Sequence, residues 1–182
     1  MTGAASHAGA SGDAFDLLGL EPRFDLDPAR LERAYLTRAA RLHPDLASGN
    51  PDAPVKAAAL NHAKAALSDP ESRANLLLAR LGGPSKDQDK SLPDGFLMDM
   101  LETRERAEGD LSSADPARLA PWKQWTQDQR SHYAQRVGEL FRALPAGGSH
   151  ADTLRAIRLE LNAWRYIERL AEQLDPARSA NL

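Results

Sequence analysis

Apolar residues recur at helical spacing in this sequence, in segments separated by proline- and glycine-containing breaks. Asp27 and Pro28 supply an N-cap and a first-turn proline, which together form a strong helix start. After them an apolar residue returns every three or four positions, at Leu31, Tyr35, Ala39 and Leu42. Patterns of this kind predict helices at about 15–18, 28–42, 54–67, 70–81, 94–108, 121–144 and 150–174.

The kinds of apolar residue in the chain also favour helices. The 182 residues include 32 Ala and 27 Leu but only 2 Val and 2 Ile. Strands draw on β-branched side chains, whereas Ala and Leu lose little on entering a helix. We therefore expect an all-α protein.

Polar and proline-rich stretches divide the chain. Residues 1–13 are mostly Ala, Gly and Ser and predict a disordered tail, and a polar, proline-flanked segment at 84–93 predicts a linker. We expect one domain at 14–83 and another at 94–176, with a short tail at 177–182. Short connections between its three amphipathic helices predict that the second domain is a three-helix bundle.

Several function classes are disfavoured. The net charge of -3 argues against general nucleic-acid binding, and the absence of Cys rules out disulfides and thiolate metal sites. The five His lack zinc-site spacing, and no glycine-rich phosphate loop is present. No apolar run approaches the roughly 18 residues of a membrane span, and residues 1–13 do not resemble a signal peptide. We expect a cytoplasmic protein that is not an enzyme and has no cofactor or metal.

The tripeptide His43-Pro44-Asp45 lies between two predicted helices and is the most informative short motif. Proline restricts its own φ and the residue before it, so the loop tip is stiffened before a partner arrives. The preceding helix carries a basic stripe, which would steer it onto an acidic partner; its arginines are Arg30, Arg33 and Arg41. Taken alone, the tripeptide favours an ordinary turn and the stripe a solvated helix face.

The order short helix, basic helix, HPD, long helix resembles a J domain. Four further stretches resemble the HscB type of J protein: FDLLGLEPRFDLD from Phe15, LNHAKAALSDPESRANLLLARLG from Leu60, FLMDMLETRE from Phe96, and WRYIERLAEQL from Trp164. The likeness runs over about residues 15 to 175. It implies a J domain, a helical hairpin with the HPD loop, joined in an L shape to a three-helix C-terminal domain.

The resemblance also implies a function. Family members stimulate ATP hydrolysis by a DnaK- or HscA-like chaperone through the HPD loop, here His43, Pro44 and Asp45, and deliver to it an iron–sulfur cluster scaffold protein of the IscU type. The scaffold-binding residues carried over are Leu97, Met98, Leu101, Glu102, Glu105 and Tyr166. Two alternatives remain: a J-domain co-chaperone for a different client, and a helical interaction protein without chaperone coupling.

Periodicity alone leaves the scaffold-binding stretch ambiguous. Leu97, Met98 and Leu101 share one edge of a helix, and Phe96 with Met100 form a second apolar pair about 100° away. The residues alone favour core for both, whereas the resemblance predicts that the first edge is an exposed patch rimmed by acid. Two positions depart from the family: Leu46, where J domains commonly have Lys, and Lys64, where an aromatic is usual. The first puts the strength of chaperone stimulation in doubt, and the second the local packing.

Overall fold

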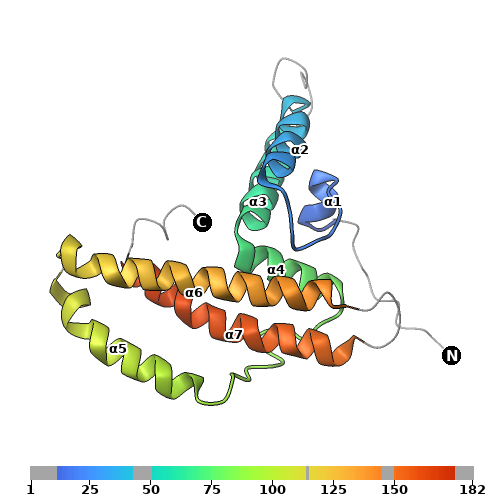
Figure 1. Ribbon diagram of the computed structural model, residues 1–182. Coiled ribbons are helices and arrows are strands. Elements are labelled where there is room, and N and C mark those ends of the chain that lie inside the picture. Colours follow the sequence, from blue (N-terminus) through green and yellow to red (C-terminus); the bar gives the residue numbers. More distant parts are fainter. Residues whose placement is uncertain (1–11, 43–50, 114, 145–149, 175–182) are drawn as a thin grey trace. The chain divides into compact units, whose positions relative to one another are not determined.

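The computed structural model describes residues 12–42, 51–113, 115–144 and 150–174 (Figure 1). Of the predicted tails, only Gly12 and Asp13 fall within these ranges. The described residues form helices joined by turns and contain no strand, which confirms the all-α prediction. The helices are α1 (Ala14–Leu18), α2 (Pro28–Ala40), α3 (Ala53–Ser68), α4 (Pro70–Arg80), α5 (Phe96–Ser113), α6 (Pro116–Arg142) and α7 (Ala151–Leu174).

The chain divides into two compact units, Met1–Ser68 and Asp69–Leu182. In the first unit α2 and α3 lie side by side as a hairpin, and α1 packs against both (Figure 1). Phe15, Leu18 and Leu67 are fully buried there, and Leu31 and Leu60 are nearly so. Of the predicted apolar stripe of 28–42, Leu31 is buried, whereas Tyr35, Ala39 and Leu42 are half-buried. The predicted helical hairpin is confirmed.

The helix ends of the first unit follow from local chemistry. Asp13 caps α1 by accepting from the backbone N–H of Phe15 at 2.9 Å. Gly19 ends that helix in the left-handed region at φ 55, where a side chain would be strained. Asp27 caps α2 by accepting from Ala29 N at 2.9 Å, as the sequence predicts.

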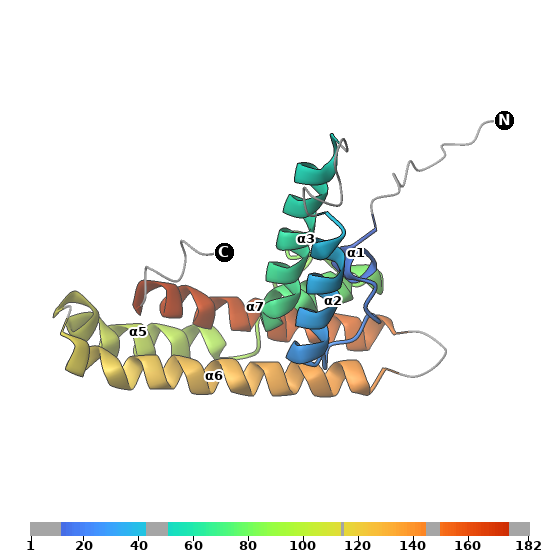
Figure 2. The ribbon, with the colours of Figure 1, turned by 90° about the horizontal axis from the view of Figure 1, so that it is seen from above.

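The second unit is built on α6 and α7, two long helices that run antiparallel (Figure 2). The predicted three helices are present as α5, α6 and α7, and α5 contacts both of the others. The helix α4 packs against α7 and, to a smaller extent, α6. By contacts the chain therefore divides at Ser68, earlier than the linker expected at 84–93.

The segment 84–93 is fastened to α7 along its length. The Arg158 Nε donates to the Pro84 carbonyl at 2.9 Å. The Asn162 Nδ2 donates to the carbonyls of Asp89 and Ser91, each at 3.0 Å. Polar composition indicated a linker here, whereas in the structure these residues are an ordered strap across α7.

Two predicted helix details are wrong. The helix α6 begins at Pro116 with Asp115 as its N-cap, so Pro121 lies inside the helix and not at its start. Asp115 provides the N-cap and Pro116 the first-turn proline. Pro121 has no capping residue before it. The helix predicted over 70–81 ends at Arg80, and Leu81 is 41% exposed because it is the C-cap residue beyond the last turn of α4.

Candidate functional site

The N-terminal half of α5 exposes a cluster of large apolar side chains. Leu97 is 58% exposed, Met98 61% and Leu101 53%. On the other side of the helix Met100, Thr103 and Ala107 are buried. We call Leu97, Met98 and Leu101 the apolar patch. Its exposure confirms the expectation from the family resemblance and contradicts the reading of these residues as core.

This clustering is unusual for the chain. Seven large apolar side chains are substantially exposed in the described residues, and the apolar patch holds three of them within five consecutive positions. Single exposed apolar residues are normal on soluble proteins, but a contiguous apolar group rimmed by polar residues marks an interaction surface. The unbranched Met98 side chain suits such a surface because it adapts to its partner.

The other residues predicted to bind the scaffold are Glu102, Glu105 and Tyr166. Glu102 and Glu105 are exposed one turn further along α5 and line an open hollow together with Arg106. Tyr166 on α7 is half-buried, and its ring meets the edge of Phe96 with 5.5 Å between centroids. That contact joins α7 to the residue before Leu97, so Tyr166 supports the helix end that carries the patch.

The second predicted site lies in the first unit. Arg30, Arg33 and Arg41 are all exposed, whereas Leu31 is buried, so the basic face of α2 and its C-cap points to solvent. Arg33 Nη2 lies 4.0 Å from Asp27 Oδ2 at the helix start. His43, Pro44 and Asp45, together with Leu46, lie outside the described residues.

Lys64, the departure from the family pattern, has a defined role in the hairpin. Its Nζ lies 2.7 Å from Glu32 Oε2 and 4.4 Å from the centroid of the Tyr35 ring. The Tyr35 hydroxyl also donates to Asn61 Oδ1 at 2.8 Å. An ion pair and a cation–π contact between α2 and α3 thus replace aromatic packing. Sequence reasoning missed these contacts because the partners lie far apart in the chain.

A polar network between α6 and α7 was also missed. Arg130 Nε donates to Glu168 Oε1 at 2.5 Å, and Trp164 Nε1 donates to the same oxygen at 2.8 Å. Arg130 Nη2 lies 3.9 Å from Asp69, the N-cap of α4. Glu168 is almost fully buried, and these donors satisfy its carboxylate oxygen. A second pair, Arg136 with Glu160, links the same two helices.

Two absences hold for the part of the chain that the structure describes. No group of three or more His, Asp or Glu side chains there is arranged to hold a metal ion. No helix there is both long and apolar enough to cross a membrane.

Comparison with known proteins agrees with this geometry. Residues 13–76 match the DnaJ domain and residues 92–175 match the HSCB C-terminal oligomerisation domain. The chain is 33% identical to the co-chaperone protein HscB homolog of Bordetella pertussis over 174 residues, which is 92% of this chain and 97% of that protein. The chain belongs to the HscB family.

Further HscB proteins support the assignment. The HscB homolog of Vibrio cholerae is 33% identical over 168 residues, covering 88% of this chain and 97% of that protein. Two solved structures share the fold. HscB from Vibrio cholerae has a TM-score of 0.70 and 24% identity, and the match covers 94% of this chain and 100% of that chain. The human co-chaperone HscB has a TM-score of 0.72 and 20% identity, and the match covers 93% of this chain and 83% of that chain.

The predicted family, the HscB-type J-domain co-chaperones of iron–sulfur cluster assembly, is therefore confirmed. HscB proteins regulate a chaperone rather than catalyse a reaction. The two domain matches leave residues 77–91 between them, so the DnaJ match includes the first half of α4. In the structure that helix packs with the C-terminal unit.

Proposed function

We propose that this chain stimulates ATP hydrolysis by a DnaK- or HscA-like chaperone and delivers to it an iron–sulfur scaffold protein of the IscU type. The observation that carries the proposal is the apolar patch, since it lies exposed in the C-terminal domain of an HscB-family chain. The protein acts as a regulator in the cytoplasm, without catalysis of its own.

The chaperone half of the function belongs to the first unit. The exposed arginines of α2 attract an acidic surface of the chaperone and speed encounter, and the HPD tripeptide makes the specific contact. Asp45 is a compact acceptor for a charge-assisted bond from a partner arginine, worth about 1.5–3 kcal/mol when desolvated. Leu46 supplies no positive charge beside this contact, so the arginines of α2 carry the electrostatic attraction.

The chaperone half is tested by ATP turnover of the partner chaperone. We expect wild type to raise the rate and His43→Gln to abolish the rise. The matched control is His62→Gln, which makes the same change at an exposed histidine of α3. A rise that persists unchanged with His43→Gln would refute this half.

The scaffold half belongs to the apolar patch. About half of the Leu97 and Leu101 side chains is open to solvent, so burying that half against a scaffold is worth about 1 kcal/mol per leucine. Replacing both leucines by Ala should therefore weaken scaffold binding about 30-fold. Glu102 and Glu105 at the rim favour a scaffold surface that carries positive charge.

Titration of the scaffold by calorimetry tests this half. Leu97→Ala with Leu101→Ala should lose affinity while the thermal stability stays close to wild type, because only exposed atoms are removed. The control is Leu36→Ala with Val55→Ala, two exposed apolar residues of the first unit. Equal affinities for the patch variant and wild type would favour a different client. A helical interaction protein without chaperone coupling is separated by the ATPase assay.

A further inference from the structure

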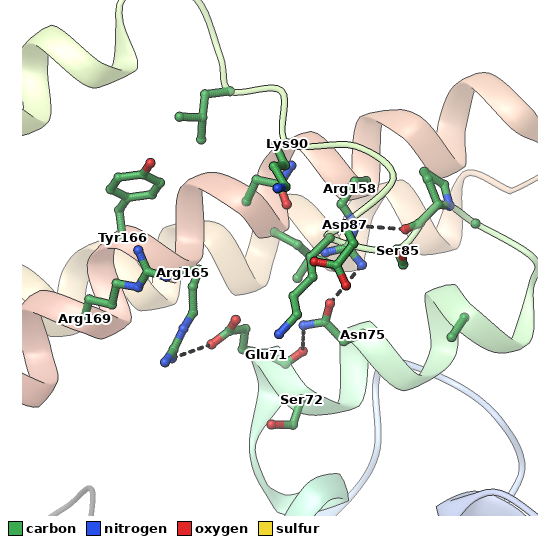
Figure 3. A pocket seen from close by; sticks show the side chains of 17 residues that line it. Glu71, Ser72, Asn75, Ser85, Asp87, Lys90, Arg158, Arg165, Tyr166 and Arg169 are labelled. Carbon is green, nitrogen blue, oxygen red and sulfur yellow. Dashed lines mark hydrogen bonds and ion pairs between the residues drawn. The ribbon is translucent and has the colours of Figure 1, made fainter.

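A cavity of about 850 Å³ lies in the second unit, between α4, the strap 84–93 and α7 (Figure 3). Its volume is in the range of small-molecule binding sites. In the close view, Arg158 and Asn75 meet at one end, and Arg165 reaches from α7 toward Glu71 on α4. The proposed function uses only Tyr166 of the residues that line it.

The lining of the cavity is strongly basic. Five cationic side chains face two carboxylates there: Lys86, Lys90, Arg158, Arg165 and Arg169 against Glu71 and Asp87. The formal sum is +3, although the whole chain carries -3. Positive charge that is gathered in a concave site focuses the field on an anionic ligand.

One of these cations, Arg158, is buried and held in place by hydrogen bonds. Arg158 is only 5% exposed. Its Nε donates to the Pro84 carbonyl and its Nη2 to Asn75 Oδ1, both at 2.9 Å. These bonds fix the guanidinium and leave its Nη1 without a protein acceptor among the described residues. A buried, preorganised guanidinium with spare donors is suited to phosphate and carboxylate groups.

The remaining cations are incompletely neutralised. Arg165 pairs with two carboxylates, at 3.7 Å from Glu71 and 3.0 Å from Glu172. Arg169 lies over the Tyr166 ring at 5.8 Å. Lys86 and Lys90 make no ion pair with any carboxylate in the described part of the chain. The lysines are therefore available to an anion that Arg158 orients.

We propose that this cavity binds a compact polyanion, a small molecule with two or more adjacent phosphate or carboxylate groups. The Arg158 Nη1 binds one group, and Lys86 and Lys90 on the strap bind the next. Because the site lies on the strap and α7, its occupation also stiffens the segment that precedes α5.

Glu71 makes the binding depend on pH. Burial raises the pKa of Glu71 to about 7; Arg165 opposes this, and the charges of Glu168, Asp69 and Glu172 add to it. Below that pKa Glu71 is neutral and the cavity holds one carboxylate, Asp87. An anion should therefore bind more tightly below pH 7 than above it.

Calorimetric titration of the full-length protein at constant ionic strength tests the site, with pyrophosphate and citrate as probes. Saturable binding of pyrophosphate alone would identify phosphate as the group recognised, and binding of both would identify polyanions in general. Lys86→Ala with Lys90→Ala should weaken binding at least about tenfold. Lys56→Ala with Lys123→Ala removes the same charge from exposed sites outside the cavity and should leave binding unchanged.

Glu71→Gln provides the second arm. Against wild type it should tighten binding above pH 7 and change little well below it; comparing the two proteins at each pH cancels the titration of the probe itself. No saturable binding of either probe at low millimolar concentration would overturn the proposal. So would equal losses in the two lysine variants, since that result indicates attraction to net charge rather than to the cavity.

Discussion

Glu71 is predicted to destabilise the second unit at neutral and alkaline pH. Its side chain is only 14% exposed, its Arg165 partner is 3.7 Å away, and burial raises its pKa from 4.5 to about 7. At pH values between 4.5 and about 7 the folded state therefore binds more protons than the unfolded state. The free energy of unfolding must then fall as pH rises through this window.

The magnitude follows from the pKa change. One pKa unit corresponds to about 1.4 kcal/mol, so the loss contributed by Glu71 between pH 4.5 and pH 7 is about 3 kcal/mol. Glu71→Gln keeps the shape of the side chain and removes its charge. The variant should match wild type near pH 4.5 and exceed its stability by about 3 kcal/mol near pH 8.

Urea unfolding followed by tryptophan fluorescence measures this effect selectively. All three tryptophans, at 122, 125 and 164, lie in the second unit, so the signal reports the unit that contains Glu71. Glu108→Gln, at an exposed glutamate of α5, is the control and should show no such gain. A Glu71→Gln protein that is no more stable than wild type near pH 8 would show that the Arg165 contact outweighs burial and that ionised Glu71 does not destabilise the unit.

Two further substitutions test the contacts that stabilise each unit internally. Gly19→Ala should destabilise the first unit by about 1–2 kcal/mol, because the residue has φ 55 and an added Cβ would lie 1.8 Å from Arg38 Nη2. Thermal unfolding followed by circular dichroism measures this loss. Gly82→Ala, at φ 75 in open space, is the control and should cost less stability; a larger loss for Gly82→Ala than for Gly19→Ala would contradict the prediction. Arg130→Met should destabilise the second unit by about 3–5 kcal/mol in the fluorescence assay, since it leaves Glu168 buried without its main partner. A loss below about 1 kcal/mol would show that the hydrogen bond from Trp164 alone is enough to stabilise the buried Glu168 carboxylate.

Local signals in the sequence predicted most of the helices. Asp27 with Pro28 marks the start of α2 by chemistry that needs no distant partner, and the structure has this start. The same reasoning failed at Pro121 because a better start, Asp115 with Pro116, lies one turn earlier. Periodicity does not choose between the two prolines, but Ala120 before Pro121 has no capping oxygen, whereas Asp115 before Pro116 has one.

Contacts across the chain were beyond sequence reasoning. Arg158 binds Pro84 across 74 positions, and Asn162 binds Asp89 across 73, so no local pattern reveals that the strap is ordered. The apolar patch was an intermediate case. Helical spacing grouped Leu97 with Leu101 on one edge, but only the family resemblance indicated that this edge stays exposed.

In the proposed function, one chain couples the scaffold to the chaperone. This coupling can be measured as ATP turnover of the chaperone with and without scaffold. Wild type should stimulate the chaperone in both cases, and more strongly with scaffold. Leu97→Ala with Leu101→Ala should lose only the scaffold-dependent increase, and His43→Gln should lose all stimulation. Stimulation by His43→Gln equal to wild type, or a full scaffold effect in the patch variant, would contradict the account.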